Sequence, residues 1–264
     1  MKLGISCKFD RFNYLQEIIN NYEIGIEITD FVDPDILNNP NLLLEYRSRY
    51  LDYFKNNKIE RTFHGPFFDL NIHAIDNEFS TMSKDKIQKA ITICRDLDCT
   101  KIIFHTGYIP ILKSKNYRKN VIEKQINFWQ DICDENKGLI ICLENMFEKD
   151  SNLIYEILDN CKKENLKFCF DIAHCVVFSN EEPLTWINKM KEYLNHVHLS
   201  DCNGIHDEHK ALGSGNIGIK ELIYKLQKIK SNLTFVIEVS GEEKVRKSLN
   251  YLYNNGLAQR KNAT

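Results

Sequence analysis

Six short apolar runs of this chain carry a metal-binding residue type at or next to their last position. The runs are RTFH, KIIFH, IICLE, KFCFD, HVHL and TFVIE, and the residues are His64, His105, Glu144, Asp171, His198 and Glu238. Imidazole nitrogens mixed with carboxylate oxygens suit Zn, Mn, Co or Fe(II), whereas calcium sites use oxygen ligands. Carboxylates gathered at one place would repel one another unless a cation lay between them. The pattern therefore predicts a divalent metal centre.

Any one of these residues has a simpler explanation. A strand-terminal Asp often caps the next helix, and a single buried His is more often hydrogen-bonded than bound to a metal. Six such residues in succession are hard to explain in this way. The following loops add His174, three residues after Asp171, and both Asp207 and His209 from HDEHKALGSGNIG. We expect these three side chains to join the centre.

The remaining histidines have weaker claims. His73 and His206 lie in polar stretches, where we expect them to be solvated. His196 shares a strand face with His198 because side chains alternate along a strand, so it is expected to orient a ligand from below.

The elements that must position these residues follow from the alternation of short apolar runs with longer amphipathic stretches, which is typical of βα units. We predict strands over Leu3–Ser6, Ile24–Ile28, Arg61–His64, Lys101–His105, Leu139–Glu144, Leu166–Asp171, His196–Leu199 and Thr234–Glu238. Helices are expected between them, including Asp85–Leu97, one beginning near Ile219 and a last one over about Glu242–Tyr253.

Eight such units predict an α/β fold, a single (β/α)8 TIM barrel over residues 1–256 with a C-terminal tail over 257–264. An open doubly wound sheet is the alternative, but the turn after the first strand, ISCKFD, lacks G-x-G-x-x-G. We expect apolar side chains inside the barrel and an active site at the carboxyl ends of the strands.

Composition limits the possible partners. The chain has 264 residues, 43% hydrophobic and 27% charged, with a net charge of -2, so no long-range attraction to nucleic acid or an anionic membrane is expected. No leader or run of about 20 apolar residues is present, which predicts a cytoplasmic protein. Nine cysteines, an odd number, are expected to be reduced thiols, with Cys142 and Cys169 in the core.

The motifs HGPFFDLN, FHTG, LENM, FDIAH, HVHLSD, DEHKALGSGNIG and IEVSG resemble the xylose isomerase-like superfamily, most closely its sugar phosphate isomerase/epimerase-like proteins. The superfamily also contains the endonuclease IV family. The resemblance to the isomerases implies one ion held by Glu144, Asp171, His198 and Glu238. The endonuclease IV pattern implies three ions: one on His64, His105 and Glu144, one on that four-residue set, and one on His174, Asp207 and His209.

Two reactions are compatible with this resemblance. Isomerisation or epimerisation of a sugar or sugar phosphate would use Glu144 and Glu238 to transfer protons, with His174 as a further candidate catalytic residue. Zinc-dependent phosphodiester hydrolysis is the alternative. DNA is the less expected substrate because the loops after the second and third strands are acidic, with Asp30, Asp33, Asp35, Asp69, Asp76 and Glu78.

We therefore expect a metal-dependent isomerase or epimerase with one to three ions of Zn, Mn, Co or Fe. The oligomeric state is not predicted. Phe67, Phe68, Met146 and Phe147 are expected either to wall a small pocket or to pack ordinary loops. The segment from Leu212 to Asn216, with Lys210, is either a phosphate cradle or a plain turn before a helix.

Overall fold

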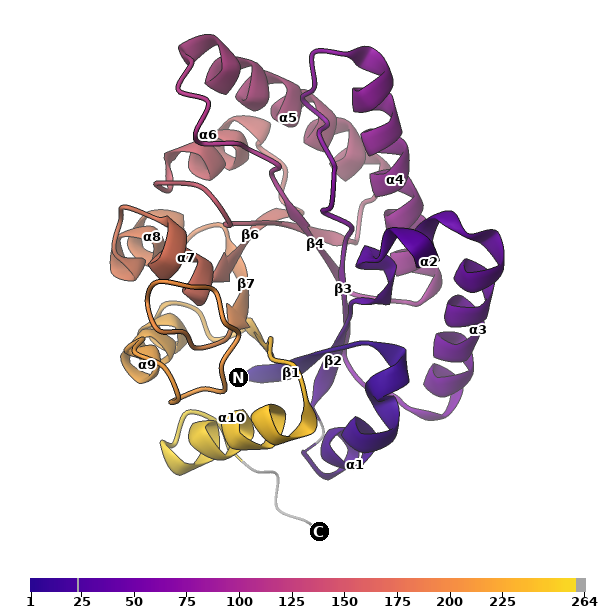
Figure 1. The fold of residues 1–264 in the computed structure, drawn as a ribbon, viewed down its shortest axis with the longest axis vertical. Helices are drawn as coiled ribbons and strands as arrows, with labels where there is room; N and C mark the ends of the chain where they lie inside the picture. Colours follow the sequence, from indigo (N-terminus) through magenta and orange to yellow (C-terminus); the bar gives the residue numbers. More distant parts are fainter. Residues whose placement is uncertain (23, 260–264) are drawn as a thin grey trace.

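Eight parallel strands close into a barrel in the computed structural model, which describes residues 1–22 and 24–259 (Figure 1). The strands are β1 (Lys2–Cys7), β2 (Gly25–Ile28), β3 (Arg61–His64), β4 (Lys101–His105), β5 (Ile140–Glu144), β6 (Leu166–Asp171), β7 (Leu194–Leu199) and β8 (Thr234–Ile237). They pair in sequence order, and β8 pairs with β1, so Gly4 lies opposite both Gly25 and Val236. The single TIM barrel fold predicted from the sequence is confirmed.

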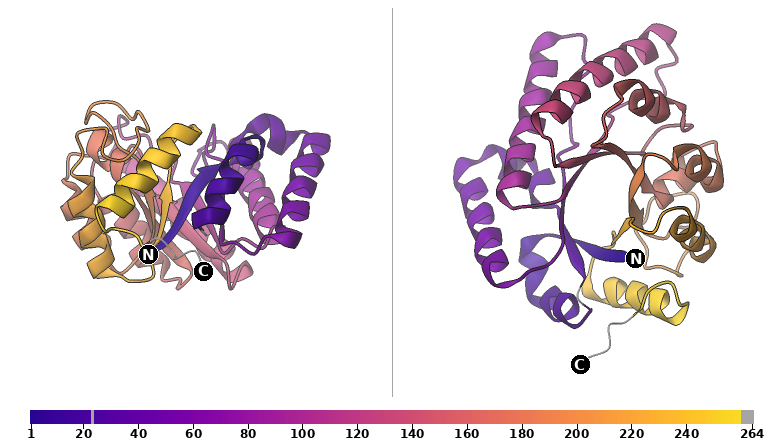
Figure 2. Two further views of the ribbon diagram at one scale, coloured as in Figure 1. Left: turned by 90° about the horizontal axis from the view of Figure 1, so that it is seen from below. Right: turned by 180° about the vertical axis from the view of Figure 1, so that it is seen from behind.

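Helices surround this barrel on the outside (Figures 1 and 2). They are α1 (Phe12–Tyr22), α2 (Pro34–Asn38), α3 (Pro40–Asn56), α4 (Asn77–Asp96), α5 (Lys115–Glu135), α6 (Asn152–Cys161), α7 (Ile172–Phe178), α8 (Pro183–Met190), α9 (Ile219–Ile229) and α10 (Glu242–Asn254), with short 3-10 turns η1 (Phe9–Arg11) and η2 (Asp30–Val32). None of the helices in the described part of the chain is long and apolar enough to cross a membrane.

The strands match their predicted bounds within two residues, and α9 and α10 begin where predicted, whereas α4 differs more. Helix α4 begins eight residues before the expected Asp85, because Asp76 accepts a hydrogen bond from the Glu78 amide and caps the helix there. Two helices instead of one follow β2, and again β6; Pro40 and Pro183 stand at first-turn positions, where proline favours a new start. In the expected tail, Leu257 is buried, and residues 260–264 lie outside the described residues.

The barrel interior is more polar than we expected. A small apolar cluster of Ile103, Cys142 and Cys169 is present. Beside it, the Lys101 ammonium is buried and donates to the Asn195 carbonyl at 3.0 Å and to Thr234 Oγ1 at 2.8 Å. The expectation of an apolar interior is wrong for this layer, where two hydrogen bonds satisfy the buried Lys101 ammonium group.

Candidate metal centre

The carboxyl ends of the strands, the first turn of α7 and the loop after β7 bring all nine predicted ligands together. Three groups, in each of which one ligand atom per residue lies within 4.8 Å of the others, include all nine: His64, His105 and Glu144; Glu144, Asp171, His198 and Glu238; and His174, Asp207 and His209. His64, His198 and Glu238 also lie within this distance of one another. Glu144 belongs to two groups because β5 lies between the strands that supply the other members. The chain therefore places nitrogen and oxygen ligands in the sets that a cluster of divalent ions requires.

Three of the histidines are oriented by backbone carbonyl groups. His64 Nδ1 lies 2.9 Å from the Gly65 carbonyl oxygen, His174 Nδ1 lies 2.9 Å from that of Asn145, and His209 Nδ1 lies 2.8 Å from that of Glu238. A carbonyl only accepts, so Nδ1 of each ring carries a proton and Nε2 is the nitrogen that can take an ion. Each Nε2 faces a carboxylate of its own group, at 3.2 to 3.4 Å. This is the arrangement in which proteins hold metal-binding histidines.

His198 is oriented by a carboxylate instead. Its Nε2 lies 2.9 Å from Glu27 Oε1, and its Nδ1 faces Glu144 Oε1 at 3.0 Å and Glu238 Oε2 at 3.2 Å. Glu27 is fully buried on β2, and its other oxygen accepts from Thr62 Oγ1 at 2.9 Å. The contact with Glu27 leaves Nδ1 of His198 as the ligand atom.

Buried oxygens without hydrogen-bond partners support a cation at this place. Glu144 Oε2, Asp171 Oδ2, Asp207 Oδ1 and Glu238 Oε2 are all buried and form no hydrogen bond within the described chain. Burying such an oxygen without a partner is costly, whereas a metal ion satisfies it. The residues present therefore fit a divalent metal.

Electrostatics at the centre leave its carboxylates ionised and the His105 ring neutral, whereas the pKa values of His174 and His198 are raised well above the usual range. Burial raises the pKa of Asp171 to about 6, leaving it ionised at neutral pH, and burial lowers the pKa of His105 to about 3, leaving its ring neutral. Burial opposes ionisation of Glu144, yet the nearby His198 and His105 hold its pKa well below the usual range.

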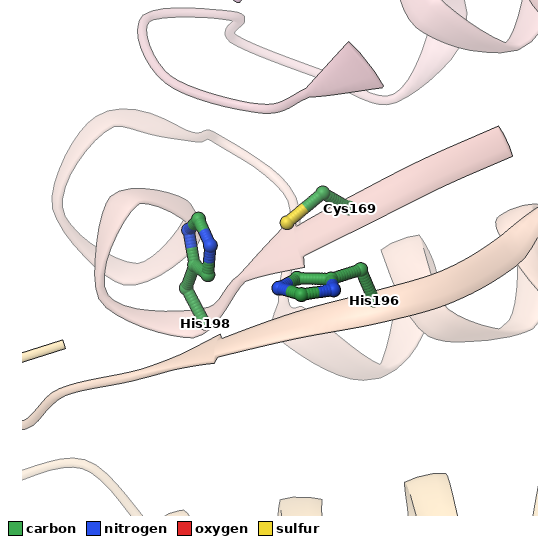
Figure 3. Close-up of side chains that lie close together, drawn as sticks. All are labelled: Cys169, His196 and His198. Carbon is green, nitrogen blue, oxygen red and sulfur yellow. The ribbon is translucent and has the colours of Figure 1, made fainter. Parts of the chain in front are cut away.

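A second cluster, Cys169 on β6 with His196 and His198 on β7, lies deeper in the barrel (Figure 3). Burial raises the pKa of the Cys169 thiol well above its usual range, so the free thiol stays protonated at neutral pH. His196 Nε2 lies 3.0 Å from Glu27 Oε2. His196 therefore lies below His198, as strand alternation predicts, and contacts the carboxylate that orients it.

Sequence reasoning missed Glu27 and Asn145. Glu27 lies within its strand, in GIEI, and not at the strand end, where the ligands were predicted. The sequence signal that could have identified it is a carboxylate between two isoleucines of a predicted buried strand. Asn145 directly follows β5 and forms a pair of 2.9 Å hydrogen bonds with the Asp171 backbone, which fixes β6 beside β5 at the centre.

The segment from Leu212 to Asn216 does not cradle an anion, because its donors are used within its own loop. Asp201 Oδ2 accepts from the Gly213 amide at 2.9 Å, and the amide of Asn216 donates to the Cys202 carbonyl at 2.7 Å. A Cβ on Gly215 would lie 2.3 Å from Asp201 Oδ1, so the chain can wrap this carboxylate only with glycine there. The Lys210 ammonium pairs with Glu208 at 2.8 Å. The alternative reading, a turn before the helix, holds.

Two cavities flank the centre. One, of about 230 Å³, is lined by His105 and by Phe67, Phe68, Met146 and Phe147, the residues suggested as pocket walls. The other, of about 390 Å³, is lined by His64, His209 and Glu238 from the centre and by residues that follow β1, β2 and β8. A ligand at the centre can therefore extend to either side.

Some residues in the surrounding loops differ from their predicted surroundings. His73 is buried rather than solvated, 3.4 Å from the Tyr117 hydroxyl, and burial lowers its pKa to about 4. His206 is exposed, as predicted. Asp30 is also buried and accepts from the Tyr50 hydroxyl, and Asp33 caps α2. The acidic loops thus present less negative charge to solvent than the sequence suggested.

Comparison with known proteins assigns the family. The sequence profile of the xylose isomerase-like TIM barrel matches residues 22–255. The chain belongs to this family. An uncharacterized protein of Methanocaldococcus jannaschii is 32% identical over 219 residues, which is 79% of this chain and 70% of the relative.

Two solved structures extend the comparison. A D-tagatose 3-epimerase-like protein is 27% identical, with a TM-score of 0.74 over 97% of each chain. IOLI protein, which contains a zinc atom, is 13% identical, with a TM-score of 0.75 over 99% of this chain and 100% of that chain. The second likeness is one of fold alone.

Proposed function

We propose that this xylose isomerase-like barrel is a divalent-metal-dependent isomerase or epimerase of a small sugar or sugar phosphate. The observation that carries the proposal is the four-residue group of Glu144, Asp171, His198 and Glu238, whose ligand atoms converge beside an open cavity. Its likeness to a D-tagatose 3-epimerase-like protein supports the sugar class. A bound divalent ion would supply polarisation of the carbonyl and hydroxyl oxygens of the sugar.

The two glutamates of the group have different access to a substrate. Glu238 lines the larger cavity and its side chain is 21% exposed, whereas that of Glu144 is 1% exposed. We infer that Glu238 removes the proton from the carbon next to the carbonyl, while Glu144 holds the centre together and takes part in proton return. For His174, contacts with Asp171, Asp207 and Glu144 outweigh burial and raise its pKa well above the usual range, so it can donate a proton when its Nε2 does not hold an ion.

Phosphodiester hydrolysis remains the second candidate, because one observation favours it. His174, Asp207 and His209 form a third ligand group, which proton transfer on a sugar does not require. Clustered ions suit the attack of water on a phosphodiester and stabilise the leaving oxygen.

Deuterium exchange separates the two reactions. We expect the Zn- or Mn-loaded protein to incorporate deuterium from heavy water into one of a panel of ketoses and ketose phosphates, measured by mass spectrometry. Glu238→Gln should slow exchange by about 10²- to 10⁴-fold, the usual contribution of a general base, and Glu144→Gln should abolish it. Glu243→Gln, an exposed change of the same charge on α10, is the control. Chelator-sensitive nicking of abasic-site duplex DNA without any deuterium incorporation would replace this proposal with the hydrolase.

A further inference from the structure

Three positively charged side chains line the larger of the two cavities beside the centre, and none of them is a candidate metal ligand. Lys8 and Arg11 follow β1, Lys244 lies on α10, and all three line this cavity of about 390 Å³ together with His64 and Glu238. The chain carries a net charge of -2, so three cations around one cavity are not a general property of its surface.

None of these three cations forms an ion pair within residues 1–22 and 24–259. The neighbouring carboxylates already have other partners. Asp10 accepts from the Tyr46 hydroxyl and from Arg49, both at 2.8 Å, and Asp30 accepts from the Phe9 amide and the Tyr50 hydroxyl.

Within the cavity itself, Glu208 pairs with Lys210 and Glu238 faces His198. The positive charges of Lys8, Arg11 and Lys244 are therefore left to attract an anion from solution.

The cavity also offers neutral donors and a fixed cation. Ser6, Thr29 and Ser240 line it, and their hydroxyl groups form no hydrogen bond with other described residues. Lys244 Nζ donates to the His209 carbonyl at 3.1 Å, which holds this ammonium group next to the metal centre. Cations and hydroxyl groups together are the usual partners of phosphate oxygens.

We propose that this cavity binds the phosphate group of a phosphorylated sugar while the reacting carbons lie at the metal centre. The inference rests on the proposed function, because Glu238 lines the same cavity. A phosphate ester carries a charge of about -1.5 to -2 at neutral pH. Three cationic side chains match this charge better than they match the single negative charge of a ligand carboxylate.

Calorimetric titration of the zinc-loaded protein with fructose 6-phosphate, fructose, fructuronate and inorganic phosphate tests the inference. We expect fructose 6-phosphate to bind at least about tenfold more tightly than fructose, since each charge-assisted hydrogen bond is worth about tenfold in affinity. The double variant Lys8→Gln/Arg11→Gln should lose most of this preference without changing the affinity for fructose. Lys225→Gln, which removes one exposed positive charge on α9, is the control. Chelator-treated protein should keep the preference for fructose 6-phosphate, because the Lys and Arg side chains provide it and the metal ions do not.

Three results would overturn the inference. These are equal binding of fructose 6-phosphate and fructose with no binding of inorganic phosphate, a preference that survives in the double variant, and tighter binding of fructuronate than of the phosphate ester. If the proposed function alone is wrong, the preference for phosphate that depends on Lys8 and Arg11 persists, but no sugar exchanges deuterium. Equal deuterium exchange into phosphorylated and unphosphorylated ketoses would instead retain the function and remove the phosphate site.

Discussion

At the scale of single residues, Glu27 is the side chain that ties the barrel interior to the metal centre. It contacts both His196 and His198, and these two histidines, acting against the effect of burial, hold its pKa well below the usual range. A carboxylate that faces a ligand histidine from behind fixes the ring and makes its other nitrogen a stronger ligand. Glu27 is therefore a positioning residue for His198.

We expect Glu27→Gln to weaken zinc binding by about 10- to 100-fold, because the amide keeps the shape of the side chain but not its charge. Competition with a chromophoric chelator measures the change. Thr62→Val is the matched control, since it removes one hydrogen bond to Glu27 and leaves the charge in place, so a smaller loss is expected. Equal zinc affinity in Glu27→Gln and the unmodified protein would show that Glu27 has no such role.

The convergence of the nine candidate ligands was predictable because each lies at a strand end or in the loop after it. Parallel strands in a barrel all end at one rim, so position in the chain was enough to place them together. Glu27 and His73 were not predictable in this way. Their surroundings depend on side chains distant in the sequence, His198 and Tyr117, and no local pattern encodes those contacts.

At the scale of elements, the loop between β7 and α9 depends on one buried carboxylate. Asp201 accepts from the amides of Cys202 at 2.9 Å, Gly213 at 2.9 Å and Ile217 at 3.3 Å. The loop also carries Asp207 and His209, and His209 adopts a positive φ of 44°, an unfavourable conformation that the surrounding contacts must maintain. The position of the third ligand group thus depends on Asp201.

We expect Asp201→Ala to remove about one equivalent of bound metal while the Glu144, Asp171, His198 and Glu238 group keeps its ion. Each lost hydrogen bond to the charged carboxylate is worth about 1.5–3 kcal/mol, enough to release the loop. Elemental analysis of the dialysed protein gives the metal content, and Glu221→Ala, an exposed change on α9 outside the loop, is the control. A metal content unchanged from that of the unmodified protein would contradict this role.

Strands were easier to predict than helices. A strand here is short, buried and apolar, so its ends are visible in the sequence. Helix α4 extends well beyond its apolar stripe because a capping aspartate and exposed polar residues continue it, and periodicity alone does not show where it begins.

At the scale of the whole molecule, the candidate ligands come from the ends of strands β3 to β8, from helix α7 and from the loop after β7. Such a centre exists only when most of the barrel has closed. An ion bound there stabilises the folded chain and has no equivalent site in the unfolded one.

We expect chelation to lower the melting temperature by roughly 5–10 °C relative to protein with zinc at about 100 times its dissociation constant. This follows from about 2.7 kcal/mol of binding linkage and a shift of about 2–4 °C per kcal/mol for a domain of this size. Thermal melts monitored by circular dichroism, with and without added zinc or manganese, measure it. Identical melts in chelator and in zinc would argue against a metal centre that forms on folding.

The two cavities beside the centre are shaped by different stretches of the chain. Residues after β3, β4 and β5 line the aromatic cavity, whereas residues after β1, β2 and β8 provide the cations and hydroxyl groups of the other. Only Phe67 and Phe68 contribute to both among the described lining residues. Mutations outside Phe67 and Phe68 can therefore alter recognition at one end of a ligand without disturbing the other end or the candidate metal centre between them. New specificities can evolve in such a barrel one loop at a time.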